Sequence, residues 1–173
     1  MMRPRLHFDR RGAAAAEMAL VAPLLLTILF SLVEAGNYFY TEHVLVKAVR
    51  DGARYAGRQD FSFFSACSGS PTGTVVSDTR ALVRTSVRTG GTDRIANIND
   101  GNISVTISCT TTATDDASAT ENMTGIWRGH PGGAPVVTVT ASANYTPVIA
   151  AAFGFNGAGF RLNASQQSAV MGL

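Results

Sequence analysis

The stretch RRGAAAAEMALVAPLLLTILFSLV, residues 10–33, joins a basic end to a long apolar run. Glu17 is its one acidic residue, and no charged residue follows from Met18 to Val33. A charge in hydrocarbon costs several kcal/mol unless it is paired, so an ionisable residue in such a segment is a functional candidate by default. Glu17 is therefore the first residue whose role needs an explanation.

The segment before the apolar run predicts the membrane topology. Residues 1–12 hold four arginines and one aspartate, and an excess of arginine ahead of an apolar span keeps that end in the cytoplasm. From Ala13 to Val33 a helix rises about 31 Å, close to the hydrocarbon thickness of a bilayer. The aromatic residues 38–40 suit the outer headgroup level. We therefore expect a single membrane pass over about residues 13–40.

A cleaved secretory signal is the simplest alternative, because it also has a basic start and an apolar middle. Val33-Glu34-Ala35 could serve as its small-residue cleavage site. Two observations weigh against this interpretation. Glu17 falls inside the apolar region, and the helical pattern continues past Ala35. An anchor that is never cleaved is a further alternative.

The junction at residues 10–17, Pro23 and the later segment AVRDGARYA, residues 48–56, occur in a specific order. In this order they resemble the type IV prepilin class. More narrowly, the chain is similar to the TadE-like pseudopilins of bacterial tight-adherence (Flp) pilus systems. The resemblance covers residues 10–57, about a third of the chain, and the rest matches only in kind.

The resemblance implies processing by a prepilin peptidase between Gly12 and Ala13, on the cytoplasmic side. The mature chain would begin at Ala13, whose amine can be methylated, and Glu17 would become its fifth residue. In an assembled bundle Glu17 can pair with the Ala13 ammonium of a neighbouring subunit, which neutralises both groups in an apolar setting.

The resemblance also implies a role, a location and partners. The role is that of a minor pilin or pseudopilin, and the location is the bacterial inner membrane or the extracellular pilus. In the membrane the chain would be single-pass, with a cytoplasmic N-terminus and a periplasmic C-terminal domain. The implied partners are the prepilin peptidase, other pilins of the same system, the inner-membrane assembly platform and the lipid bilayer.

The charge balance changes once the basic leader is set apart. The 173-residue chain has 14 basic and 12 acidic residues, a net charge of +2. Removing residues 1–12 leaves ten basic and eleven acidic residues, a net charge of −1. The apparent basicity thus comes from the leader, and we expect no nucleic-acid partner.

The chain has two cysteines, Cys67 and Cys109. Both follow the expected span, on the predicted periplasmic or extracellular side, where disulfides persist. We predict that they pair, which in the chain-entropy model stabilises the domain by roughly 4 kcal/mol. Two separate thiols, or a bond to another chain, are the alternatives. No metal site is expected, because no pair of histidines lies near them.

The first helix is expected to extend over residues 13–58, well beyond the membrane. Its outer half combines a narrow face of small and apolar residues with a neighbouring stripe of basic residues. The apolar face consists of Leu45, Val49, Gly52 and Ala56, and the stripe of Lys47, Arg50, Arg54 and Arg58. The stripe either contacts anionic headgroups or acidic patches on other subunits, or is simply solvated.

Residues 59–173 are expected to form a small extracytoplasmic α+β domain. A loop over residues 59–74 leads to a second amphipathic helix over about 75–89, which Gly90-Gly91 ends. Alternating apolar and polar residues then predict strands. The strands are expected at residues 103–109, 137–145 and 160–170, the last with Phe160, Leu162 and Ala164 on one face. Each strand has one apolar face, which favours an antiparallel sheet.

A long polar insert, residues 110–134, separates the first two strands and contains the single tryptophan, Trp127. Connections of this length are usually functional or disordered. A contact surface for another subunit is one interpretation, and a mobile loop with Trp127 folded onto the domain is the favoured one.

No catalytic constellation is present in the sequence. The histidines at 7, 43 and 130 share no recognisable spacing with a nucleophile and an acid, and no metal-ligand pattern occurs. We therefore expect a protein that is not an enzyme and has no cofactor. The alternative function is a permanently anchored periplasmic binding or adhesion module, in which leader and helix act only as a tether.

Overall fold

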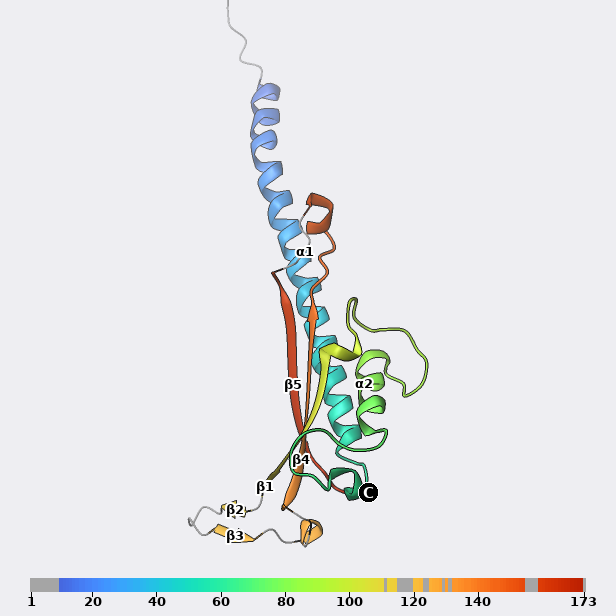
Figure 1. The fold of residues 1–173 in the computed structure, drawn as a ribbon. Helices are drawn as coiled ribbons and strands as arrows, with labels where there is room; N and C mark the ends of the chain where they lie inside the picture. Colours follow the sequence, from blue (N-terminus) through green and yellow to red (C-terminus); the bar gives the residue numbers. More distant parts are fainter. Residues whose placement is uncertain are drawn as a thin grey trace, which may run out of the picture.

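One long helix organises the whole molecule (Figure 1). The computed structural model describes residues 10–110, 112–114, 120–122, 125–128, 130, 132–154 and 159–172. Helix α1 spans Arg10–Ala56 and is, among the described residues, the one helix long and apolar enough to cross a membrane. Residues 1–9 of the expected leader lie outside the described residues.

The other elements form a small domain around the outer half of α1. They are the 3-10 helix η1 (Phe61–Phe64), helix α2 (Val75–Thr85), η2 (Asp100–Asn102), strands β1 (Ile103–Thr110), β2 (Thr112–Thr114) and β3 (Thr120–Asn122), η3 (Gly125–Trp127), β4 (Ala134–Asn144), η4 (Ala150–Phe153) and β5 (Arg161–Ala169).

Strands β1, β4 and β5 form an antiparallel sheet in the order β1-β4-β5. The register pairs Val105 with Val139 and Ala141 with Ala164. Alternate residues of β1 and β4 are buried, because one face of the sheet packs against α1 and α2. The predicted α+β fold with three antiparallel strands is confirmed.

The outer half of α1 supplies the helical side of the core. The predicted face of small and apolar residues is fully buried, while the four residues of the basic stripe are exposed. The core also includes Phe64 of η1, Val75 and Val83 of α2, and Leu162 of β5. The Tyr55 hydroxyl, 2.9 Å from Asp78, donates a hydrogen bond that joins α1 to α2. Burial, with this contact to a carboxylate, raises the pKa of Tyr55.

Helix α2 ends earlier than its sequence pattern predicts. The expected end near Thr89 is wrong, since Ser86 adopts a left-handed conformation (φ 72°) and its amide caps the carbonyl of Leu82. Val87 is therefore exposed and is not part of the buried face. The chain leaving α2 is held by Arg84, which forms ion pairs with Asp93 at 2.9 Å and Asp100 at 2.8 Å.

The third strand also differs from its prediction at one end. Leu162 is fully buried and Ala164 half-buried, but Phe160 precedes β5 and is 65% exposed. Phe160 therefore does not share the buried face. Its backbone carbonyl accepts a hydrogen bond from the Tyr145 amide at 2.9 Å.

The long insert between β1 and β4 contacts the domain through Trp127. Its described part contains the short antiparallel pair β2–β3. The Trp127 indole donates a hydrogen bond to the Val170 carbonyl at 2.7 Å, and its side chain is half-buried. The predicted folding of Trp127 onto the domain is thus observed. Residues 111, 115–119, 123–124, 129 and 131 lie outside the described residues.

Two glycines allow α1 to approach its neighbours closely. A Cβ atom on Gly52 would lie 2.6 Å from Cγ2 of Val83, and one on Gly57 would collide with Ser168. A Cβ atom on Gly36, in the same helix, would meet nothing within 4 Å.

We predict that Gly52→Leu lowers the free energy of unfolding by about 1–3 kcal/mol, because it overpacks the contact between α1 and α2. Gly36→Leu is the matched control, since both changes give the helix the same gain in intrinsic propensity. The measurement is urea unfolding of the full chain in detergent micelles. Equal midpoints for the two variants would contradict the packing argument.

Candidate functional site

The residues singled out at the start of the chain lie in the first two turns of α1. Gly12, Ala13 and Glu17 are exposed, and a Cβ atom on Gly12 would meet nothing within 4 Å. No described residue forms a hydrogen bond or an ion pair with Glu17. The described residues therefore neither require glycine at position 12 nor provide a partner for the Glu17 carboxylate.

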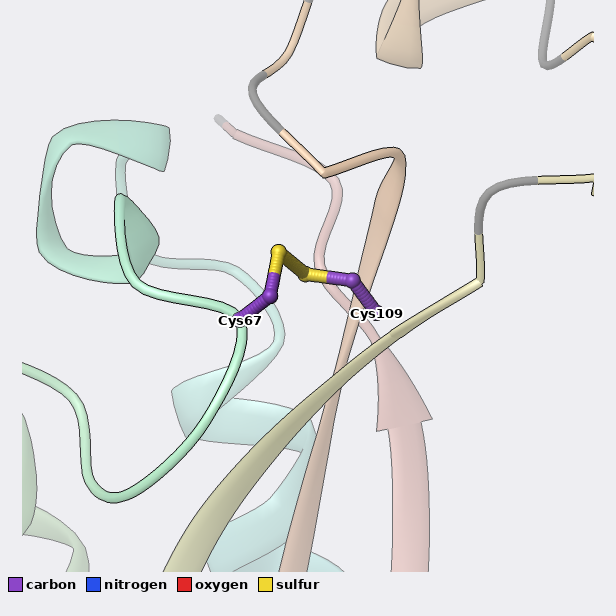
Figure 2. Close-up of a disulfide and its surroundings, with 2 residues drawn as sticks. All are labelled: Cys67 and Cys109. Carbon is purple, nitrogen blue, oxygen red and sulfur yellow. A yellow bond between two sulfur atoms is a disulfide. The ribbon is translucent and has the colours of Figure 1, made fainter.

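The two cysteines lie side by side at the far end of the domain. Cys67 follows η1 and Cys109 lies near the end of β1, with their sulfur atoms at bonding distance and their Cα atoms 5.1 Å apart (Figure 2). The Ile107 amide donates to the Gly69 carbonyl at 2.9 Å and fixes the same loop. Gly132 packs directly on the Cys67 sulfur, where a side chain would collide.

A second carboxylate, Glu34, forms the most concentrated polar site in the described structure. It ends the uncharged run of α1 and accepts hydrogen bonds from the chain that connects β4 to β5. The donors are the Tyr145 hydroxyl and the backbone amides of Val148 at 3.2 Å, Ile149 at 2.8 Å and Ala150 at 3.0 Å.

The geometry follows from the local structure on both sides. The three amides lie at the first residue of η4 and in the two residues before it, where backbone N–H groups have no partner within the helix and favour a negative charge. Tyr145 comes directly after β4, whose alternation directs its ring inward against Tyr38 of α1, with ring centroids 5.2 Å apart. Asn37, one turn after Glu34, donates to the Tyr145 hydroxyl at 2.7 Å. We call Glu34, Asn37, Tyr145 and the three amides the junction site.

A largely apolar groove of about 820 Å³ lies between α1 and the β4–β5 connection. Its polar lining is Glu34 and Tyr145 of the junction site, with Thr27 and Ser31. Phe30 and Phe153 line this groove, and the centroids of their rings are 6.1 Å apart. Figure 1 shows η4 beside α1, beyond the ends of β4 and β5. The other apolar side chains of the groove are Ala35, Tyr38, Phe39, Ile149, Ala150 and Phe160.

The remaining polar feature of the outer half of α1 is its basic stripe. The basic stripe on α1 is exposed along its length, and only the adjacent Asp51 has an ion-pair partner, Arg94, at 3.9 Å. Within the part of the chain that the structure describes, no group of three His, Cys, Asp or Glu side chains could hold a metal ion.

Sequence reasoning considered Glu34 only as part of a cleavage signal and so missed the junction site. Two signals in the sequence point to it. Glu34 is the first charge after the apolar run, with Asn37 one turn later, and Tyr145 extends the inward-facing positions of a strand. The three amide donors cannot be recognised from the sequence, because any residue except proline has a backbone N–H group.

Comparison with known proteins finds a family match for the first helix. The family described as TadE-like protein matches residues 12–54, which is α1 from its first turn almost to its end. No curated protein and no solved structure matches the chain. The resemblance stated from the sequence is confirmed over this helix.

We predict that Glu34→Gln loosens the β4–β5 connection, because hydrogen bonds to a charged acceptor contribute about 1.5–3 kcal/mol. Hydrogen exchange of the Val148, Ile149 and Ala150 amides should accelerate by roughly ten- to a hundredfold. Glu42→Gln is the control, since Glu42 lies on the same helix without a hydrogen bond or ion pair to any described residue. Unchanged exchange in Glu34→Gln would show that the carboxylate does not hold the connection.

Proposed function

We propose that this chain is a minor pilin or pseudopilin of a tight-adherence (Flp) pilus system. The match of residues 12–54 to the TadE-like family indicates a protein associated with this pilus, and it is the observation that carries the proposal. The apolar inner half of α1 is compatible with a single-pass membrane anchor.

In this proposal a prepilin peptidase cuts between Gly12 and Ala13 on the cytoplasmic side of the inner membrane. Two properties of the helix support the cut. Glycine presents no side chain that would obstruct a protease, and Ala13 to Ala16 form a narrow, exposed start of α1. The mature chain keeps its domain in the periplasm until assembly, and then in or beside the filament.

In this proposal, cleavage supplies the positive charge that Glu17 needs as a partner. A carboxylate near the start of an apolar helix needs a partner, and the described residues provide none. Cleavage creates an ammonium at Ala13, one turn away along a neighbouring helix, and the two opposite charges can neutralise each other in the apolar bundle. The proposed partners are other pilins of the system, the peptidase and the inner-membrane platform.

We expect Gly12→Val to block trimming in cells that contain the cognate peptidase. Since a side chain at position 12 meets only open space, the fold and the membrane insertion should be unaffected. The intact mass of the membrane-bound protein reports the result, because the mature form lacks residues 1–12. Gly36→Val, also in open space, is the control and should be trimmed like the wild type. A wild-type protein that retains residues 1–173 in the native membrane would instead support a permanent tether.

Glu17→Ala should permit trimming but impair pilus assembly. Removing one partner of a buried ion pair costs about 3–5 kcal/mol, because the other charge is left unpaired. The readouts are intact mass for trimming and the amount of sheared pili for assembly, with Glu42→Ala as the control on the same helix. Normal pili from trimmed Glu17→Ala would refute the pairing role.

A further inference from the structure

The β4–β5 connection is an uncharged segment fixed to the apolar part of α1. Residues 145–160 contain no acidic or basic side chain and no histidine. The junction site holds the connection against α1 at Glu34, and Phe153 packs against Phe30, still further toward the inner end of the helix. The described residues 145–154 of this connection are therefore held at a fixed position along α1.

Helix geometry sets the level of Phe153 in a bilayer. Phe30 lies 17 residues after Ala13, which corresponds to about 26 Å of rise, whereas the hydrocarbon layer is about 30 Å thick. With Ala13 at the inner boundary, Phe30 lies just inside the outer boundary. Phe153 must then lie at the same depth.

The connection and the neighbouring part of α1 expose large apolar side chains from this level outward. Val148 is 63% exposed, and Phe153 and Phe160 are each 65% exposed. On α1, Phe39 and Tyr40 are 60% and 69% exposed. Apolar and aromatic side chains gathered in this way are typical of the interface between hydrocarbon and headgroups.

The backbone of the connection is also suited to an environment without water. A backbone N–H group exposed to lipid without a partner costs several kcal/mol. The Glu34 carboxylate accepts hydrogen bonds from the amides of Val148, Ile149 and Ala150. The Ala152 amide donates to the Ile149 carbonyl, and the Gly154 amide donates to the Ala151 carbonyl. Five backbone amides at and around η4 thus have a hydrogen-bond acceptor within the chain.

We propose that the β4–β5 connection is a membrane-binding element, which seats Val148, Phe153 and Phe160 at the hydrocarbon–headgroup boundary of the outer leaflet. Phospholipid acyl chains fill the groove between it and α1. This rests on the proposed membrane insertion of α1, and it adds a second contact that sets the depth and rotation of the anchored domain.

The test places a single tryptophan at defined depths in the full chain. In a Trp127→Phe background, tryptophan is introduced as Phe153→Trp, Phe160→Trp or Leu25→Trp, with Arg58→Trp at the far end of α1 as the control. Each protein is reconstituted in phosphatidylcholine vesicles brominated either near the headgroup end or near the end of the acyl chains. We expect blue-shifted emission at positions 153 and 160 with stronger quenching by the shallow bromines. Position 25 should be quenched by the deep bromines, and position 58 by neither.

The outcomes separate this inference from the proposed anchor. Quenching at position 25 without quenching at 153 and 160 would overturn the lipid contact and leave the anchor standing. Absence of quenching at all three positions would overturn both. Blue-shifted but unquenched emission at 153, with cross-linking between copies, would assign the groove to a second chain and overturn the lipid contact. Phe153→Cys carrying an environment-sensitive fluorophore retains Trp127 and tests the same depth if the background variant is unstable.

Discussion

The hydrogen bonds between the Glu34 carboxylate and the amides of Val148, Ile149 and Ala150 connect the two environments of α1. On one side of Glu34 the helix exposes apolar side chains, and on the other side its apolar face is buried under a sheet. A helix that serves both environments needs a defined boundary between them. Glu34 provides it, because a chain segment more than a hundred residues away is held there by a charged acceptor rather than by shape alone.

Beyond this boundary the domain is fixed by close contacts at the other end of α1. Gly52 in α1, and Gly57 directly after it, lie so close to α2 and β5 that a side chain at either position would collide with them. Cys67 and Cys109 join the loop after η1 to the end of β1. Three strands and two helices bury a small core, and closing a loop of this length contributes roughly 4 kcal/mol in the chain-entropy model. The outer half of α1 is therefore held at both ends of the domain, and its inner half continues from it as the same helix.

The sequence predicted those parts of the fold that depend on local periodicity. Alternation in β1 and β4 and the small-residue face of α1 required only neighbouring residues, and all three are observed. The end of α2 was missed because Ser86 takes a left-handed conformation that a non-glycine residue rarely adopts. Phe160 was assigned to the wrong face because its exposure depends on where the β4–β5 connection lies. The junction site was missed because three of the four donors to Glu34 are backbone amides, which any residue except proline supplies.

The contrast between Glu34 and Glu17 shows what the folded chain leaves unresolved. Both carboxylates border the same uncharged run, and Glu34 has four donors within its own chain. Glu17 has none among the described residues, although it lies deeper in the apolar part of the helix. Such a charge is costly unless it is paired, and the proposed function assigns its partner to a neighbouring subunit. In the proposed function this partner is the new amine at Ala13 of a neighbouring helix, so that cleavage supplies the charge that Glu17 needs in the assembled bundle.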